Sequence, residues 1–203
     1  MAAEPLPAPL AEPLPSWVIP PHDGFTAEDF FDLRGLPAHT ELIDGSLVFM
    51  SPQRMWHSWV VNLFQSELDR QAPDRLRAAR EMAVKLGLHQ VPEPDVVVVT
   101  AEAHDRDPLA THFGSDDVVM VVEAVSPDSL ERDRDTKPRK YGAAGITHFW
   151  RVENEDDRAV VYTYQLDPAS GVYAVTGIHH DRLKTTVPFD LDIDLTAVGT
   201  KPQ

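Results

Sequence analysis

The chain has 203 residues, of which 42% are hydrophobic and 25% are charged, and this suits one soluble domain with a sizeable core. It contains no cysteine, so disulfides, thiolate zinc sites and cysteine nucleophiles are excluded. The formal charge of −15 repels nucleic acid over most of the surface, so nucleic-acid binding needs a local basic patch. The absence of a spanning apolar run and of a secretory signal predicts a cytoplasmic protein without membrane contact.

The N-terminal residues are expected to form an extended arm over residues 1–22, followed by a single domain over residues 23–203. Residues 1–21 contain seven of the 18 prolines, and proline fixes φ and removes backbone donors. The first predicted element of the domain is a short helix in "TAEDFFDLR", with Thr26 as its N-cap and Asp29 in its first turn.

A hairpin and a longer helix are predicted next. "TELIDGSLVFM" places two apolar strands around Asp44-Gly45, a strong type I′ turn signal. "MWHSWVVNLFQSELDRQ" has apolar residues at helical spacing, and Pro73 follows soon after its end. "REMAVKLGL" then predicts a strand.

Two valine-rich stretches, "EPDVVVVT" (93–100) and "VVMVVEAVSP" (118–127), are typical of strands buried on both faces. The segment between them, 101–117, is predicted to be a polar loop of the length that often borders a functional site. "DTKPRKYGAAG" predicts a helix whose N-cap falls near Asp135 or later, because Pro138 is not tolerated deep inside a helix.

The remaining sequence reads as successive strands in an antiparallel meander, with turns at "NEDD" and "DPASG". The aromatic residues of "FWRV" are expected in the core. The order of elements predicts an α/β or α+β fold, with a central mixed sheet flanked by helices, an N-terminal hairpin and a C-terminal strand meander.

Two stretches carry enough basic residues to form a local patch, residues 70–85 and "RDRDTKPRK". Both are equally consistent with ordinary solvated faces.

Each valine-rich strand also carries one acid, Asp95 at the start of the first and Glu123 near the end of the second. An unpaired buried charge costs several kcal/mol or more, so something cationic is expected to face Asp95. If the strands are neighbours, the carboxylates converge and suit Mg²⁺ or Mn²⁺. The alternative is that the acids lie at exposed strand ends or pair with arginines.

The stretches "EPD" with its valine strand, "VVEAVSPDS" and "RDRDTKPRKYGAAGITHFWRVE" resemble the Uma family of restriction-endonuclease-like proteins. "ELIDGSLVFMSP", followed by a helix containing His57, fits the same pattern, and the resemblance spans roughly residues 24–195. The family is placed in the PD-(D/E)XK nuclease superfamily, whose members cut DNA phosphodiester bonds with a divalent metal. The resemblance therefore implies a restriction-endonuclease-like fold.

The resemblance also implies that Asp95 and Glu123 are metal ligands. The superfamily lysine is expected two residues beyond the second acid, but Val125 stands there. Lys137 looks like a migrated replacement that orients the attacking water or neutralises developing charge. The alternative for Lys137 is a surface residue paired with Asp133, an exposed pairing worth only a few tenths of a kcal/mol.

Four further residues are candidates. Glu41 is a possible third acid, or else a strand-edge charge opposite a basic neighbour. His57 either touches a phosphate or water, or packs among the tryptophans of its helix. Tyr141 supports the lysine or packs on the sheet, and Lys140 is a rival for the role of Lys137.

The leading hypothesis is metal-dependent hydrolysis of nucleic acid, with DNA as the expected substrate and a homodimer expected by analogy. The second is a nuclease-like fold that acts as a binding or assembly module without turnover. A hydrolase for another phosphorylated substrate is the third, although the sequence has neither a P-loop nor a G-x-S-x-G elbow.

Overall fold

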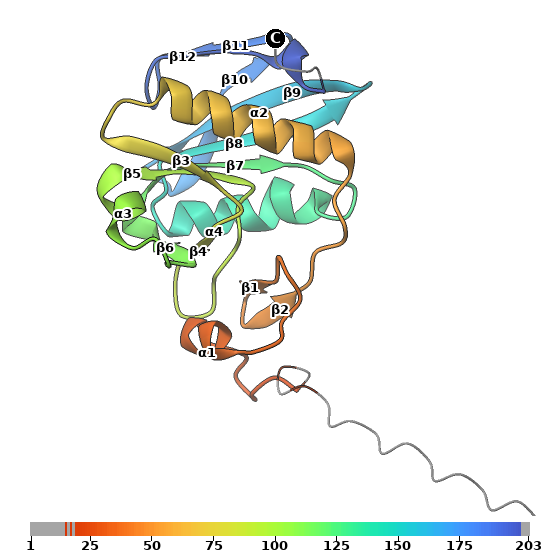
Figure 1. Cartoon of the computed structure of the whole chain (residues 1–203), viewed down its shortest axis with the longest axis vertical. Helices are drawn as coiled ribbons and strands as arrows, with labels where there is room; N and C mark the ends of the chain where they lie inside the picture. The colour runs from red at the N-terminus through yellow and green to blue at the C-terminus, as the bar shows by residue number, and fades with distance from the viewer. Residues whose placement is uncertain (1–14, 16, 18, 200–203) are drawn as a thin grey trace, which may run out of the picture.

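A six-stranded mixed sheet forms the centre of the protein (Figure 1). The computed structural model describes residues 15, 17 and 19–199, so most of the predicted arm lies outside the described residues. The strand order is β10-β9-β8-β7-β5-β3, and all neighbouring pairs are antiparallel except β7 and β8. The strands are β3 (Leu76–Arg80), β5 (Val96–Thr100), β7 (Val118–Ala124), β8 (His148–Glu155), β9 (Arg158–Asp167) and β10 (Val172–His179). The helices are α1 (Ala27–Asp32), α2 (Met55–Gln71), α3 (Ala101–Arg106) and α4 (Lys137–Ala143). The predicted mixed sheet with flanking helices is confirmed.

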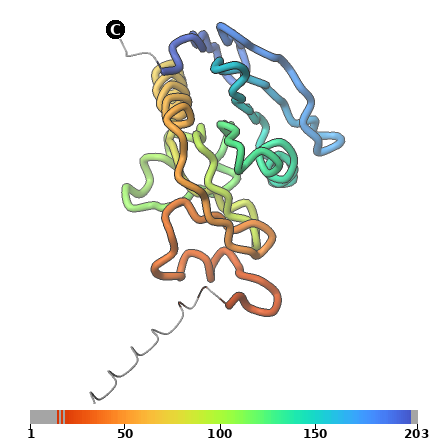
Figure 2. Tube along the Cα trace, turned by 90° about the vertical axis from the view of Figure 1, so that its right-hand side faces the viewer, coloured from red at the N-terminus to blue at the C-terminus, as the bar shows by residue number. Residues whose placement is uncertain are grey.

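Both faces of the sheet are covered, which explains the valine-rich central strands. Val96 and Val98 pack in the core on the α2 side, whereas Val97 and Val99 pack in the core on the α4 side. Successive side chains of a strand point to opposite faces, so four valines in a row fill both cores. Figures 1 and 2 show α2 and α4 on opposite faces of the sheet. Each fully buried valine contributes about 1.5–3 kcal/mol relative to an exposed one.

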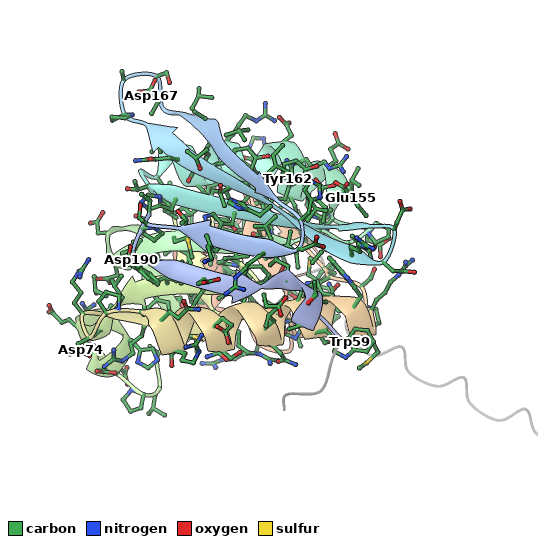
Figure 3. The ribbon with its side chains drawn as sticks, turned by 90° about the horizontal axis from the view of Figure 1, so that it is seen from above. Trp59, Asp74, Glu155, Tyr162, Asp167 and Asp190 are labelled. Atoms are coloured by element: carbon green, nitrogen blue, oxygen red, sulfur yellow. The ribbon has the colours of Figure 1, made fainter. Side chains whose placement is uncertain are left out.

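Helix α2 covers its face of the sheet together with a C-terminal hairpin, β11 (Arg182–Thr185) and β12 (Leu191–Asp194). The helix buries residues at helical spacing, among them Val60, Phe64 and Leu68. It ends at Gln71, and its C-cap residue Ala72 is extended because the next residue is proline. Figure 3 shows the hairpin between α2 and the β8–β10 meander.

The N-terminal part forms a small module around the hairpin of β1 (Glu41–Ile43) and β2 (Ser46–Val48). Helix α1 begins with the predicted Thr26 cap, which forms a capping box with Asp29. Asp44 and Gly45 have φ values of 50° and 75°, as a type I′ turn requires. Two backbone hydrogen bonds of 2.7 and 3.0 Å join Leu42 to Val91, a few residues before β5. They bring Glu41 close to the start of that strand.

Two sequence predictions around β5 are wrong. Segment 101–117 is not a continuous loop, because it contains α3 and β6 (His112–Gly114), which pairs with β4 (Ala83–Lys85). The Thr100 side chain caps α3, while Ala103 and Phe113 are buried in the core. Strand β3 was not predicted, because its arginines alternate with small or apolar residues and read as a basic patch.

The helical segment that carries Lys137 starts earlier than predicted. A π-helical turn, η3 (Arg132–Thr136), precedes α4, and two α-helical residues precede that turn, so the helical backbone begins at Leu130 and not near Asp135. The Lys137 N–H reaches back five residues to the Arg132 carbonyl, and Pro138 occupies the first turn of α4, where its missing N–H is tolerated.

The predicted meander is confirmed in β8, β9 and β10. Its turns fall at Asp156-Asp157 and after Asp167, and the aromatic residues Phe149 and Trp150 are buried. Among the residues described here, no helix is both long and apolar enough to cross a membrane.

Candidate active site

Asp95 and Glu123 are brought together by the pairing of β5 with β7. Val96 lies opposite Val122 in this antiparallel pair, so the preceding Asp95 and the following Glu123 meet at the same end of the two strands. The Asp95 Oδ2 atom accepts a hydrogen bond of 2.7 Å from the backbone N–H of Ala124, the residue next to Glu123. The two acids predicted from the sequence are therefore neighbours.

The group that faces Asp95 is His57, in the first turn of α2. Its Nε2 atom lies 2.9 Å from Oδ1 of Asp95. Burial lowers the pKa of His57, but the hydrogen bond to the Asp95 carboxylate and its negative charge outweigh burial, so the pKa is raised. His57 is thus a polar partner of the acid and not only a packing residue.

Lys137 lies at the centre of a buried ionic cluster. Its Nζ atom is 2.8 Å from Oε1 of Glu41 and 3.1 Å from Oε1 of Glu123. A third carboxylate oxygen, Oδ1 of Asp133, is 3.6 Å away, and the lysine is 2% exposed. Burial alone lowers the pKa of Lys137, but the carboxylates of Glu123 and Glu41 raise it well above its ordinary value. Lys137 is therefore a fixed cation, and the exposed pairing with Asp133 is excluded.

The cluster holds more negative charge than its single ammonium group neutralises. Burial raises the pKa of Glu123 well above its ordinary value, and Lys137 opposes the shift, while Asp133, Asp95 and Glu41 add to it. The Oε2 atom of Glu41 is buried without a hydrogen-bond partner. The cluster thus favours uptake of one further positive charge.

Tyr141 and Lys140 differ sharply in where they point. Tyr141 is buried one turn after Lys137, and its hydroxyl donates a hydrogen bond of 2.5 Å to Oε1 of Glu123. The Lys140 ammonium instead forms an ion pair with Asp44 in the hairpin turn. Lys140, the predicted rival of Lys137, therefore ties α4 to the hairpin and does not join the cluster.

A cavity of about 440 Å³ lies beside the cluster and reaches Asp95. It is lined by His39, Met50, Ser51, Pro52, Gln53, His57, Ser58, Glu81, Glu93 and Asp95. Glu93 is partly buried, and its Oε1 atom lies 2.6 Å from Nδ1 of His39. Burial raises the pKa of Glu93, and the His39 hydrogen bond opposes this shift. Asp95 is therefore the acid of the central pair that a molecule in the cavity can reach.

Three members of the site were missed or misread from the sequence. The sequence prediction places Asp133 only at the surface, as a partner of Lys137, although its spacing of four residues from that lysine is the signal that links the two. Glu93 stands two residues before Asp95, on an alternating pattern that could have identified it. Glu81, at a φ of 52°, carries no local signal that links it to the cavity.

The donor atoms of the acid pair fit a hard divalent cation. Mg²⁺ prefers carboxylate oxygens, keeps several waters and is usually held by only one or two carboxylates. The orphaned Oε2 atom of Glu41 adds a further oxygen without a partner. Within the described part of the chain, no group of three or more His, Asp or Glu side chains is arranged to hold a metal ion. A divalent cation at this site would therefore be coordinated by Asp95 and Glu123 and by water molecules.

A mixed sheet whose neighbouring strands deliver an aspartate and a glutamate beside a helix-borne lysine defines a restriction-endonuclease-like domain. The family model Uma2, described as "Putative restriction endonuclease", matches residues 27–196, and the chain belongs to this family. The predicted resemblance is confirmed.

A solved structure from Anabaena variabilis ATCC 29413, described as "a putative nuclease belonging to DUF820", is similar in fold, with a TM-score of 0.61 and 18% sequence identity. The similarity covers 86% of this chain and 97% of that one. No curated protein matches the sequence.

Proposed function

We propose that this protein is a divalent-metal-dependent endonuclease that hydrolyses phosphodiester bonds of nucleic acid, with DNA as the substrate. Membership of Uma2 supports a nuclease, and the chemistry of the site supports the metal. The observation that carries the proposal is the meeting of Asp95 and Glu123 beside the buried ammonium of Lys137. A homodimer is part of the proposal, because cutting two strands suits a two-fold assembly.

In the proposed mechanism, Asp95 and Glu123 would hold Mg²⁺ or Mn²⁺, and Asp95 is the one of the two that lines the cavity. Such an ion, when bound, polarises a phosphodiester and lowers the pKa of a bound water. Lys137 stays protonated between Glu41 and Glu123, so it presents a fixed positive charge to the attacking water or to the charge that develops on phosphorus.

The other residues of the site keep these groups in place. Glu41 anchors the lysine, and the backbone N–H of Glu93 donates a hydrogen bond of 2.9 Å to Oε1 of Glu41. Tyr141 orients Glu123, and His57 orients Asp95. Each group that acts on the substrate is thus held by at least one neighbour.

The test is a cleavage assay with Asp95→Ala and Glu123→Ala in Mg²⁺ and Mn²⁺. Both variants should lose cleavage while keeping the far-ultraviolet circular dichroism of the wild type. Asp116→Ala is the matched control, because Asp116 is an exposed acid in the connection before β7, away from the cluster. Undiminished cutting by either site variant would refute its assigned role.

A second candidate function is a nuclease-like fold that binds or assembles without turnover. Two observations favour it. Lys137 is engaged by carboxylates on several sides, and in the described residues no three His, Asp or Glu side chains are arranged to hold a metal ion. Calorimetry with Mg²⁺ or Mn²⁺, followed by nuclease assays, separates the two functions, since metal binding without cutting supports the module.

A further inference from the structure

The basic stretch from Arg132 to Lys140 contains five cationic side chains, and four of them are neutralised within the protein. Lys137 lies among the buried carboxylates, and Lys140 pairs with Asp44. The remaining two pairs are Arg134 with Glu153 and Arg139 with Asp135. Arg132 differs, because no carboxylate of the described residues lies within ion-pair distance of its guanidinium group.

Arg132 also lies where the lack of an ion-pair partner is destabilising. The residue is partly buried, and its Nε atom is buried without a hydrogen-bond partner. Its Nη2 atom lies 3.7 Å from the Sδ atom of Met50, a weak acceptor. A buried donor of a charged group without an acceptor is destabilising, and acidic side chains are plentiful in a chain of net charge −15. A contribution to the stability of the fold therefore does not explain this placement of Arg132.

The guanidinium group lies next to the candidate active site. Met50, its contact, lines the cavity that also contains His57 and Asp95. Along the chain, Arg132 directly precedes Asp133, and its carbonyl accepts the hydrogen bond from the backbone of Lys137 that closes the π-helical turn. The π-helical turn thus begins with an unpaired cation beside the cavity and is closed by Lys137, the cation of the buried cluster.

We infer that Arg132 binds a phosphate group of the nucleic-acid strand that enters this cavity. The inference rests on the proposed function and adds a substrate contact to it. A guanidinium group presents a planar fork of donors that matches two phosphate oxygens, and such charge-assisted pairs are stronger than neutral hydrogen bonds. The phosphate supplies the acceptor that Arg132 lacks, and the arginine offsets the repulsion between the strand and the acids Glu81, Glu93 and Asp95.

The experiment compares Arg132→Gln with Arg139→Gln. Both changes remove one positive charge from the same helical segment, but Arg139 is exposed and already paired with Asp135. Binding of a labelled DNA duplex and of a labelled single strand is measured by fluorescence anisotropy in Mg²⁺ over a range of salt concentrations. All proteins carry Glu123→Gln, so that the bound strand stays intact. The midpoint of thermal unfolding is measured on the same samples.

Arg132→Gln should weaken binding by about tenfold or more, the effect of losing a hydrogen bond to a charged group. It should also reduce the slope of log K against log salt by about 0.9 for the duplex or about 0.7 for the single strand. The unfolding midpoint should not fall, whereas a structural role for Arg132 predicts that it does. Arg139→Gln should leave both the affinity and the slope close to those of the parent protein, which carries Glu123→Gln alone.

Parent-like affinity in Arg132→Gln, or an equal loss in Arg139→Gln, overturns the inference and leaves the proposed function standing. If the parent protein binds neither the duplex nor the single strand, and the wild type cuts neither of them, the proposed function is overturned and the inference with it.

Discussion

The hydroxyl of Tyr141 donates a hydrogen bond to the same Glu123 oxygen that lies 3.1 Å from the ammonium group of Lys137. Tyrosine and lysine stand one helical turn apart, so α4 holds this carboxylate with two donors at once. Both donors and the acceptor are buried. The position of Glu123 is therefore fixed by α4 as well as by its own strand.

Tyr141→Phe should cost about 1.5–3 kcal/mol of the free energy of unfolding, because it removes a hydrogen bond to a buried charged group. Cleavage should fall but not vanish, since Lys137 still contacts Glu123. Urea unfolding and the cleavage rate together test this. Tyr162→Phe is the matched control, because the Tyr162 hydroxyl bonds to Glu155 at the exposed surface. Equal losses of stability in the two variants would contradict the prediction.

Lys137→Met should destabilise the protein by about 3–5 kcal/mol, because Glu41, Glu123 and Asp133 then remain buried without a cation. It should also abolish cleavage. Lys140→Met removes the same charge three residues later, but from a pair with the exposed Asp44, so its cost should be about 1 kcal/mol or less. Chemical denaturation compares the two variants directly. Similar unfolding free energies would show that the buried cluster does not depend on its lysine.

Gly45→Ala should reduce both stability and cleavage without touching any charged group of the site. Gly45 has a φ of 75°, and a Cβ atom there would lie 3.2 Å from the Cα atom of Gly24. The change should cost more than about 1 kcal/mol and displace the hairpin that carries Glu41. Gly35→Ala is the control for backbone strain alone, since Gly35 has a φ of 73° with nothing within 4 Å of the added atom. Measured unfolding midpoints should rank Gly45→Ala below Gly35→Ala.

His148 should make the protein less stable in mild acid. Burial in β8 lowers the pKa of His148 below its ordinary value of 6.5. The unfolded chain therefore takes up the proton at a higher pH than the folded protein does. The stability that the neutral ring contributes is complete above pH 6.5 and is lost as the pH falls toward the folded pKa.

His148→Gln removes the pH-dependent contribution of this histidine to stability. Between neutral pH and mild acid, the urea midpoint of the variant should therefore fall less than that of the wild type. Both proteins contain the other histidines, so the difference between them reports on His148. A parallel fall of the two midpoints would exclude His148 as the source.

The elements with a strong local pattern were predicted well. Helix α2 has the predicted bounds because its apolar spacing runs up to Pro73, and the two valine strands follow from burial on both faces. Strand β3 failed because alternating arginines resemble a solvated patch, although Leu76 and Ala78 are buried on one side.

The site was predicted in part, because its residues could be recognised but their surroundings could not. The adjacency of Asp95 and Glu123 follows from two neighbouring strands. The burial of Lys137 does not, because a lysine is accommodated inside a protein only when distant segments supply its counter-charges. Likewise, no local pattern links His57 to Asp95, which are 38 positions apart.

The three carboxylates around Lys137 come from the hairpin, from a central strand and from the helical turn before the lysine itself, at positions 41, 123 and 133. Glu41 precedes the cation that joins the three acids by 96 residues, whereas Glu123 and Asp133 precede it by only 14 and 4. The site consequently cannot exist in a partly made or partly opened molecule, so any cutting activity is confined to chains that have completed their long-range closure.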